Sequence, residues 1–217
     1  MVKILPTPKS CEMLEGCLTL PANLSVLDKT FSPLADAFAT AFEKMYELPL
    51  SRKEGGITLE MDPTLPAGHY VCDFSERMRL LASDVDGMRS AVATALQIIE
   101  IKDAALACDR LVIRDYPDKD YRALMVDLSR CWHPFHTLLR YVDVCWILKL
   151  KYLHLHFIDD PSYTLPSRAF PKLPTPGRHY TEEQIAELNA YAKARGIILI
   201  PEIEGDRKST RLNSSHA

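Results

Sequence analysis

The sequence has 217 residues, of which 47% are hydrophobic and 25% charged, with a net charge of −3. This composition is typical of an ordinary globular protein with room for one large domain or two smaller ones. No apolar run approaches the ~20 residues of a membrane-spanning helix and no basic run favours nucleic acid, so neither a membrane nor a nucleic acid is an expected partner.

The N-terminus and the cysteines indicate the cellular compartment in which the protein is expected. Pro6 and Pro8 interrupt the first residues before an apolar signal-peptide core is formed. The six cysteines are spread along the chain without a Cys-x-x-Cys pair, which indicates free, mostly buried thiols and neither a zinc site nor a redox motif. We therefore expect a cytoplasmic protein without a metal or a cofactor.

Residues 1–118 are predicted to form a small mixed α/β domain. Turn residues separate short strands, which are expected at 18–20, 57–61, 69–73, 78–82 and 111–113. Two helices interrupt them, one over 31–48 and one that opens at Asp86 and Gly87. The apolar stripe of the first helix consists of Leu34, Phe38, Phe42 and Met45. Nothing here concentrates catalytic residue types, so we expect a structural domain.

The segment from Asp115 to Asp120 is polar and contains a proline, which is typical of a domain junction. Three nearly continuously apolar strands follow, at 123–128, 152–157 and 197–203. Such strands suit a parallel sheet covered on both faces. A helix over 135–149 and a second one, capped by Thr181 and ended by Gly196, alternate with them. This β-α-β-α-β order builds a sheet that is either open or closed into a barrel.

Residues 206–217 differ in composition and pattern from both predicted parts of the chain, 1–118 and 119–205. They read Asp-Arg-Lys-Ser-Thr-Arg-Leu-Asn-Ser-Ser-His-Ala, without apolar periodicity. Through His216 they resemble the conceptual translation of a common sequencing adapter, and we exclude them from fold reasoning as an artefact. The alternative is a natural disordered tail. Under the adapter interpretation the gene continues past Gly205 and the chain is a truncation.

Polar side chains follow each of the three predicted strands. In strand order they are Asp127 and Arg130, then His156, Asp159 and Asp160, then Glu202 and Glu204. The carboxyl ends of parallel strands meet at one edge, which is where β/α barrels and open α/β sheets bind ligands. The sequence therefore predicts a ligand site at this edge.

Five motifs occur in order in the second half, at residues 121–130, 150–160, 170–173, 180–185 and 195–204. Together they resemble the first third of the catalytic domain of β-N-acetylhexosaminidases, glycoside hydrolase family 20. Residues 1–118 are similar to the small N-terminal α/β domain of that family. Two positions depart from its pattern: Leu155 stands where tryptophan is frequent, and Asp206 begins a tail where Pro-Gly-His is expected.

The resemblance implies an α/β fold, with a small N-terminal domain over 1–118 and, over 119–205, the first three β/α units of an incomplete TIM (β/α)8 barrel. It implies hydrolysis of terminal β-linked N-acetylglucosamine or N-acetylgalactosamine from an oligosaccharide or glycoconjugate. The mechanism is retaining and substrate-assisted, because the 2-acetamido oxygen of the sugar attacks the anomeric carbon. The acid/base Asp-Glu pair of the family lies near the end of the fourth strand, beyond this chain. No residue here is therefore expected to be catalytic, and these 217 residues alone are expected to be inactive.

The substrate-binding residues that the resemblance implies are Arg130, His156, Asp159, Asp160, Glu202 and Glu204. Arg130 aligns with an arginine that holds sugar hydroxyls, and its rigid fork of donors serves two neighbouring oxygens at once. His156 and Asp159 align with polar residues that support the sugar site. For Glu202 and Glu204, ligand binding and pairing with Arg130 both remain open.

Two other functions are alternatives. His154 and His156 on one strand also resemble the start of a metal-dependent amidohydrolase-type barrel, although that motif belongs on the first barrel strand and here occupies the second. A non-catalytic carbohydrate-binding relative is the other alternative. Otherwise we expect His154 to be a satisfied core histidine, and Trp132 and Trp146 to be core residues in preference to sugar platforms.

Overall fold

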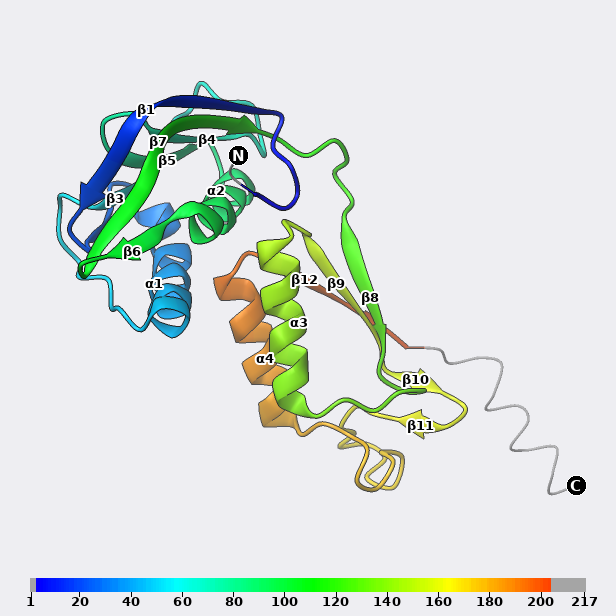
Figure 1. Cartoon of the computed structure of the whole chain (residues 1–217). Coiled ribbons are helices and arrows are strands. Elements are labelled where there is room, and N and C mark those ends of the chain that lie inside the picture. The colour runs from blue at the N-terminus through cyan, green and yellow to red at the C-terminus, as the bar shows by residue number, and fades with distance from the viewer. Residues whose placement is uncertain (1–2, 204–217) are drawn as a thin grey trace, which may run out of the picture.

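The computed structural model describes residues 3–203, which form two units arranged in four layers (Figure 1). Helices of both units lie between the two sheets. They are α1 (Ser32–Tyr46), α2 (Val85–Ile98), α3 (Phe135–Ile147) and α4 (Glu182–Ala194). The first two pack on the N-terminal sheet and the last two on the second sheet, while α2 contacts α3 and α1 contacts α4. Within the described range no helix is long and apolar enough to cross a membrane.

The N-terminal sheet has the strand order β1-β7-β4-β5-β3-β2, with β6 paired to β7. Its strands are β1 (Ser10–Leu20), β2 (Leu24–Val26), β3 (Ile57–Met61), β4 (Tyr70–Phe74), β5 (Met78–Ala82), β6 (Glu100–Lys102) and β7 (Ala105–Asp115). The predicted strands at 57–61 and 78–82 are confirmed, and that at 69–73 is displaced by one residue. Those at 18–20 and 111–113 are parts of the much longer β1 and β7. The short strands β2 and β6 were missed.

The first helix, α1, follows a short 3-10 turn, η1 (Lys29–Phe31), and buries the predicted stripe. Leu34, Phe38 and Phe42 are at most 2% exposed, whereas Met45 near the end is 53% exposed. At 3.6 residues per turn Met45 lies on the same side of the helix as the other three, so its exposure reflects its place in the last turn of α1, beyond the buried part of this side. The helix is also shorter than the predicted 31–48.

The second helix, α2, begins one residue earlier than the predicted Asp86. Its N-cap is Asp84, whose side chain accepts a hydrogen bond from the backbone N–H of Gly87 at 2.7 Å. A Cβ at Gly87 would lie 2.3 Å from the carbonyl oxygen of His69. Glycine is therefore required where α2 passes over the loop before β4.

The second unit is a parallel sheet in the order β12-β9-β8 with α3 and α4 on one face. Its strands are β8 (Ala123–Asp127), β9 (Tyr152–His156) and β12 (Ile198–Glu202). This is the predicted β-α-β-α-β order. The three predicted strands and both predicted helices are confirmed, with ends that move by one or two residues.

One face of this sheet is not covered by the described residues, and we call it the open face. Leu153 and Leu155 of β9 point to the helices and are at most 1% exposed. On the opposite face Met125 is 50% exposed and Ile198 is 46% exposed, with His154 beside Met125 in register. Side chains of a strand alternate between faces, so every second residue lies on the open face. The expectation of burial on both faces is therefore wrong for residues 3–203.

The N-terminus of α4 carries the predicted capping box. The Thr181 hydroxyl accepts a hydrogen bond from the backbone N–H of Gln184 at 3.2 Å, and the Gln184 side chain accepts one from the backbone N–H of Thr181 at 3.0 Å. Two backbone donors that have no partner within the helix are thereby satisfied. Gly196, two residues after α4, has a φ of 66°, the left-handed conformation expected for it.

Replacing the capping threonine tests this local account. Thr181→Ala is expected to lower the free energy of unfolding by about 1 kcal/mol, because it removes the side-chain acceptor of one terminal N–H. Urea unfolding followed by circular dichroism measures the loss. Thr40→Ala makes the same chemical change on an exposed position inside α1, where alanine is the better helix former, and should not destabilise. Equal losses in the two variants would contradict the assignment of the cap.

A buried ionic group joins the two units. Lys149, two residues after α3, donates from Nζ to the Tyr70 hydroxyl at 2.8 Å and to Asp115 Oδ2 at 3.2 Å. The Tyr70 hydroxyl itself donates to Asp115 Oδ2 at 2.8 Å. The side chains of Lys149 and Asp115 are only 7% and 10% exposed. One unit thus supplies the lysine and the other supplies its carboxylate and phenol.

Arg89 of α2 is a second buried cation at the same contact. Its Nη1 donates to the carbonyl oxygen of Leu150 at 2.9 Å, and its own carbonyl oxygen accepts from the Trp146 indole at 3.2 Å. Burial lowers the pKa of Arg89 to about 10. A Cβ on Gly196 would lie 2.9 Å from Arg89 Cδ, so the turn after α4 also packs on this side chain.

Candidate functional site

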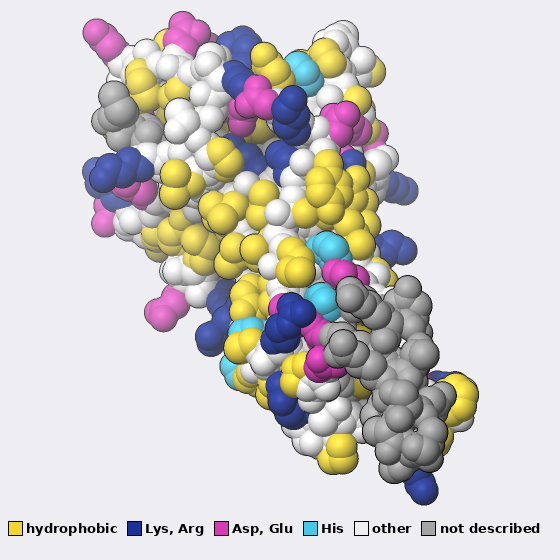
Figure 2. Space-filling view, turned by 90° about the vertical axis from the view of Figure 1, so that its right-hand side faces the viewer, with side chains coloured by type: hydrophobic (Ala, Val, Ile, Leu, Met, Phe, Trp, Pro, Cys, Tyr) yellow, Lys and Arg dark blue, Asp and Glu magenta, His cyan; other side chains and the backbone are white. Residues whose placement is uncertain are grey.

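Three ionisable side chains form a row across the open face at the carboxyl ends of its strands. His156 of β9 is the register partner of Asp127 of β8 and of Glu202 of β12. Figure 2 views the molecule from the side on which β8 lies in Figure 1, and there histidine, acidic and basic side chains lie close together beside apolar ones. The structure therefore brings the ends of the three strands together at one edge. Glu204 lies outside the described residues.

Arg130 extends from this row towards solvent. Asp127 holds the turn that carries it, because Asp127 Oδ1 accepts from the backbone N–H groups of Ser129 at 3.0 Å and Arg130 at 2.8 Å. The Arg130 guanidinium contacts Asp127 Oδ2 through Nη1 at 3.0 Å and the carboxylate of Asp159 through Nη2. Its side chain nevertheless stays 65% exposed. A guanidinium fixed on one side by two carboxylates presents its remaining donors to a ligand in a defined direction.

The electrostatics of Asp127 agree with this arrangement. Burial alone raises the pKa of its carboxyl group, but the backbone N–H of Arg130, the neighbouring charge of His156 and the guanidinium of Arg130 together hold the pKa below its usual value. Asp127 is therefore ionised at neutral pH and remains a partner for Arg130. The sequence Asp-Leu-Ser-Arg places Asp127 three residues before Arg130 and so allowed this pairing, although Asp127 was predicted only to lie at the end of the strand.

Asp159 and Asp160 differ in their surroundings. The Asp159 side chain is 2% exposed, and its Oδ1 accepts from the backbone N–H of Asp160 at 2.7 Å. Asp160 is exposed at the tip of a small hairpin formed by β10 (Ile158–Asp159) and β11 (Ser162–Tyr163). The hairpin was not predicted, because two-residue strands leave no periodic signal. The buried member of the pair supports Arg130, and the exposed member faces solvent.

Two serines that the sequence reasoning missed connect this hairpin to the Arg130 turn. Ser129 Oγ donates to the carbonyl oxygen of Ser162 at 2.6 Å, and Ser162 Oγ donates to the carbonyl oxygen of Ser129 at 2.8 Å. Arg178 Nη2 donates to the same Ser129 carbonyl at 3.0 Å. Both serines are buried. This reciprocal pair of hydrogen bonds fixes the turn after β8 against the hairpin after β9. The two serines are 33 residues apart, and no local sequence pattern predicts their contact.

Glu202 lies between two imidazoles. Its Oε2 is 2.7 Å from His154 Nε2 and 3.6 Å from His156 Nδ1. His156 is 5% exposed, and its Nε2 is 2.5 Å from the carbonyl oxygen of Ile158. The His154 side chain is 26% exposed on the open face. The expectation of a satisfied core histidine is therefore wrong: His154 does not lie in the core, and within residues 3–203 its Nε2 makes no hydrogen bond in spite of the short distance to Glu202. Of the two alternatives for Glu202, pairing with Arg130 is not what the structure shows, since Glu202 contacts histidines.

The remaining candidates give a mixed result. Trp146 is 1% exposed and is a core residue as predicted, while Trp132 is partly buried and stacks on Tyr180 with ring centroids 4.5 Å apart. Within residues 3–203 no group of three or more His, Cys, Asp or Glu side chains is placed to hold a metal ion. His154, His156 and Glu202 lie close together but do not form such a group.

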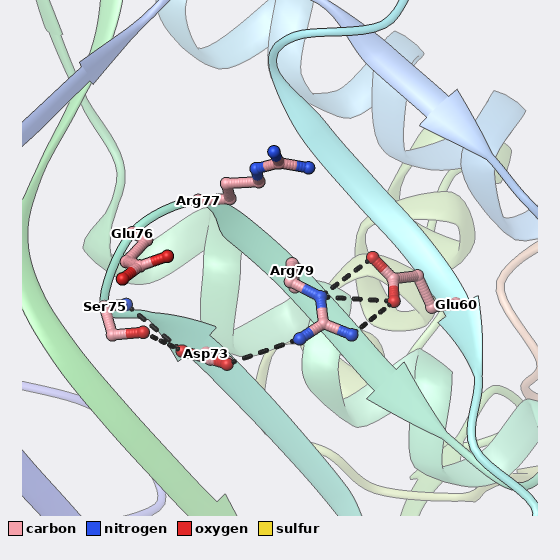
Figure 3. Close-up of a pocket in the computed structure, with 6 residues that line it drawn as sticks. All are labelled: Glu60, Asp73, Ser75, Glu76, Arg77 and Arg79. Carbon is pink, nitrogen blue, oxygen red and sulfur yellow. Dashed lines mark hydrogen bonds and ion pairs between the residues drawn. The ribbon is translucent and has the colours of Figure 1, made fainter.

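A polar hollow on the N-terminal sheet is a different kind of site (Figure 3). Its central guanidinium, Arg79, donates to both oxygens of Glu60 at 2.7–3.2 Å and lies 3.6 Å from Asp73. The Arg79 hydrogen bond holds the pKa of Glu60 below its usual value. Ser75 donates to Asp73 at 2.6 Å. These groups satisfy one another across β3, β4 and β5, as cross-strand pairs on a solvated sheet do.

Comparison with protein-family models matches both halves of the chain. Residues 1–116 match glycosyl hydrolase family 20, domain 2, and residues 120–206 match glycosyl hydrolase family 20, catalytic domain. Curated relatives include a beta-hexosaminidase of Vibrio furnissii, 29% identical over 94% of this chain and 37% of the relative. Beta-hexosaminidase subunit A2 of Dictyostelium discoideum is 36% identical over 94% of this chain and 41% of its own length.

Solved structures agree. A family 20 exo-β-N-acetylglucosaminidase of Vibrio harveyi, in complex with N-acetylglucosamine, superposes with a TM-score of 0.84 at 25% identity over 92% of this chain and 36% of its own. A β-N-acetylhexosaminidase of Bacteroides fragilis gives a TM-score of 0.82 at 25% identity, over 97% and 47%. The chain therefore spans less than half of the relatives that it matches. The predicted resemblance is confirmed, and the chain belongs to glycoside hydrolase family 20.

Proposed function

We propose that this chain is part of a β-N-acetylhexosaminidase and contributes the portion of the site that holds the terminal sugar. The observation that supports this most is Arg130, a 65% exposed guanidinium held by Asp127 and by the 2% exposed carboxylate of Asp159 at the carboxyl ends of parallel strands. Paired carboxylates leave the arginine fixed but still able to donate outward. Vicinal sugar hydroxyls accept such a fork of donors well.

The six proposed substrate-binding residues divide by environment. Arg130 and Asp160 are exposed and are proposed to contact sugar hydroxyls directly. Asp159 and His156 are buried and are proposed to support that contact. Glu202 is included through its histidine contacts, and Glu204 through its position in the Pro-Glu-Ile-Glu sequence. The acid/base Asp-Glu pair is proposed to lie outside this chain, so none of its residues is assigned to bond cleavage.

The proposals for the domain bounds and the substrate class follow from the membership of the chain in glycoside hydrolase family 20. Residues 1–118 are proposed as the small N-terminal domain, 119–205 as part of a (β/α)8 barrel and 206–217 as a segment outside both. The substrate class is a glycan or glycoconjugate with a terminal β-linked N-acetylhexosamine. All six cysteines are free thiols, which supports a reducing, cytoplasmic compartment.

The proposal is tested with the complete gene product that contains this chain. We expect it to hydrolyse a chromogenic N-acetyl-β-glucosaminide, and we expect the 217-residue chain alone to show no turnover, because a barrel of this type needs eight strands. Activity that survives a chelator separates it from a metal-dependent amidohydrolase. A complete product that binds the sugar without cleaving it would identify a carbohydrate-binding relative and overturn the proposal.

A further inference from the structure

The chain passes from α3 to β9 through residues 147–151, which we call the α3–β9 turn. Two side chains of α2 hold its backbone. The Ile147 carbonyl oxygen accepts a hydrogen bond from Gln97 Nε2 at 3.2 Å, and the Leu150 carbonyl oxygen accepts one from Arg89 Nη1 at 2.9 Å. The N-terminal unit therefore reaches the backbone of this turn near both of its ends.

The side chains of the α3–β9 turn reach back into the N-terminal unit. Lys149 donates to Tyr70 and Asp115, and the Lys151 ammonium pairs with Asp86 near the start of α2. Lys149 has a φ of 58°, a left-handed conformation that residues with a side chain rarely adopt. Glycine would fit this conformation more easily, but it would leave Asp115 without its ammonium partner. The contacts between the units therefore hold the turn in a backbone conformation that it would otherwise seldom take.

Arg89 also supports the start of β12. A Cβ on Gly196 would lie 2.9 Å from Arg89 Cδ, and Gly196 precedes β12 by two residues. Arg89 is 0% exposed, yet within residues 3–203 its Nε and Nη2 have no hydrogen-bond partner. An apolar side chain of similar length would fill the space without this cost, so packing alone does not account for a guanidinium here. One side chain thus lies against the amino ends of two neighbouring parallel strands.

The sugar-facing groups lie at the opposite ends of the same strands. Figure 1 shows the hairpin of β10 and β11 at the end of the second unit that is away from the N-terminal unit. There the Leu128 N–H donates to the His156 oxygen at 2.9 Å, and the Phe157 N–H donates to the Glu202 oxygen at 3.2 Å. All five residues of β9 are paired in register with both β8 and β12. Because β9 is short and paired on both sides, the place where it begins determines where its end presents Asp159.

We propose that Arg89 is a positioning residue for the sugar site: it fixes the start of β9 and so sets where the end of β9 presents Asp159 to Arg130. This inference gives the N-terminal unit a part in sugar binding, and it rests on the proposed function for the role of Arg130. The competing role is local, in which Arg89 stabilises only the contact between the two units. The two roles differ at the carboxyl end of β9, because a local role leaves that end unchanged.

The first test uses the 217-residue chain and needs no activity. Hydrogen exchange of the Leu128 and Phe157 amides reports on the carboxyl end of β9, whereas the amides of β5 report on the N-terminal sheet. Arg89→Met is expected to speed the exchange of the two carboxyl-end amides about tenfold relative to the amides of β5, because their strand loses a fixed start. Arg89→Lys keeps a donor for the Leu150 carbonyl oxygen and should restore most of the protection.

Two further variants separate positioning from a general loss of stability. Leu59→Ala removes a buried side chain of β3, a strand that supplies none of the groups holding the α3–β9 turn, and should not single out the two carboxyl-end amides. Gln97→Met removes the hydrogen bond to the Ile147 carbonyl oxygen and should speed the same two amides by a smaller factor, so the test stays decisive if Arg89→Met does not fold. Faster exchange that is confined to the start of β9, or shared equally by both sheets, would overturn the inference.

The second test uses the complete gene product at a temperature at which circular dichroism shows each variant to be folded. Arg89→Met is expected to raise KM for a chromogenic N-acetylglucosaminide about tenfold and to change kcat less, because a small misplacement of a binding group weakens binding strongly. Arg89→Lys should return KM to within about threefold of the parent, and Leu59→Ala should leave KM unchanged even where it lowers Tm. An unchanged KM in folded Arg89→Met would overturn the inference. A parent product without hexosaminidase activity would overturn the proposed function, while hydrogen exchange would still decide whether Arg89 acts on the far end of β9.

Discussion

Asp115→Ala is expected to lower the free energy of unfolding by about 3–5 kcal/mol, the range for removing one member of a buried ion pair. The substitution leaves the Lys149 ammonium, 7% exposed, with the Tyr70 hydroxyl as its remaining hydrogen-bond acceptor among the contacts described above. It also takes the acceptor from the Tyr70 hydroxyl and from the backbone N–H of Lys9, which donates to Asp115 Oδ1 at 3.1 Å. Urea unfolding of the chain measures the loss.

Two matched variants separate the buried pair from a general effect of charge. Asp118→Ala breaks the pair with Lys9, in which the Asp118 side chain is 74% exposed, and should cost less than about 1 kcal/mol. The double variant Asp115→Leu with Lys149→Met removes both charges and should recover most of the stability, because no unpaired charge is left. Equal losses for Asp115→Ala and Asp118→Ala would contradict the account of the contact between the units.

The pair of Lys149 and Asp115 also makes the stability of the chain depend on pH, in a direction that can be predicted. Burial lowers the pKa of Lys149 below its ordinary value, and Asp115 opposes this shift. Without Asp115 the folded-state pKa falls further, so between that value and ~10.4, the ordinary pKa of lysine, the unfolded chain binds more protons than the folded chain. The stability of Asp115→Ala should therefore rise with pH across this window, and the difference from the parent chain should shrink.

Arg130→Lys is expected to reduce kcat/KM of the complete gene product roughly 100-fold, which corresponds to about 2.7 kcal/mol of transition-state stabilisation at 1.36 kcal/mol for each factor of ten. Lysine keeps the positive charge, but it cannot contact Asp127 and Asp159 through two nitrogens and still present a planar donor pair to the sugar. The measurement is steady-state hydrolysis of a chromogenic N-acetylhexosaminide, with circular dichroism to show that the variant folds.

A second arginine provides the control. Arg168 also contacts a carboxylate, with Nε 2.6 Å and 2.8 Å from the two oxygens of Glu182, but its side chain is 85% exposed in the loop before α4. Arg168→Lys should leave kcat/KM within about twofold of the parent, because an exposed pair contributes little. If Arg130→Lys behaved like Arg168→Lys, Arg130 would have no special role in holding the sugar.

Elements with a strong local pattern were predictable from the sequence, and short ones were not. The capping box at Thr181 and the apolar runs of β9 and β12 located the second unit within one or two residues. By contrast β2, β6, β10 and β11 have only two or three residues each, and their pairing depends on partners that lie elsewhere in the fold. Burial on both faces of the second sheet was also wrong, because an apolar strand does not reveal which of its faces the described chain covers.

The sequence predicted that the site lies at the ends of the parallel strands, but it did not predict which side chains contact one another there. Arg130 and Asp159 come together because parallel strands deliver their carboxyl ends to one edge, a rule that needs only the element order. The contact of Glu202 with His154 depends on register, and the reciprocal pair of Ser129 and Ser162 depends on a hairpin without a local signal. The buried position of Lys149 against Asp115 depends on how the two units pack, which periodicity within either unit does not encode.

The stereochemistry of the first product tests the central claim most directly. Proton NMR of the complete gene product acting on a β-linked N-acetylglucosaminide should show the β-anomer of N-acetylglucosamine first, with the α-anomer appearing only by mutarotation. The matching β-glucoside, which has a hydroxyl in place of the 2-acetamido group, should not be hydrolysed, because the attacking oxygen belongs to the substrate. Initial formation of the α-anomer, or equal hydrolysis of the β-glucoside, would contradict the assignment of this chain to a substrate-assisted β-N-acetylhexosaminidase.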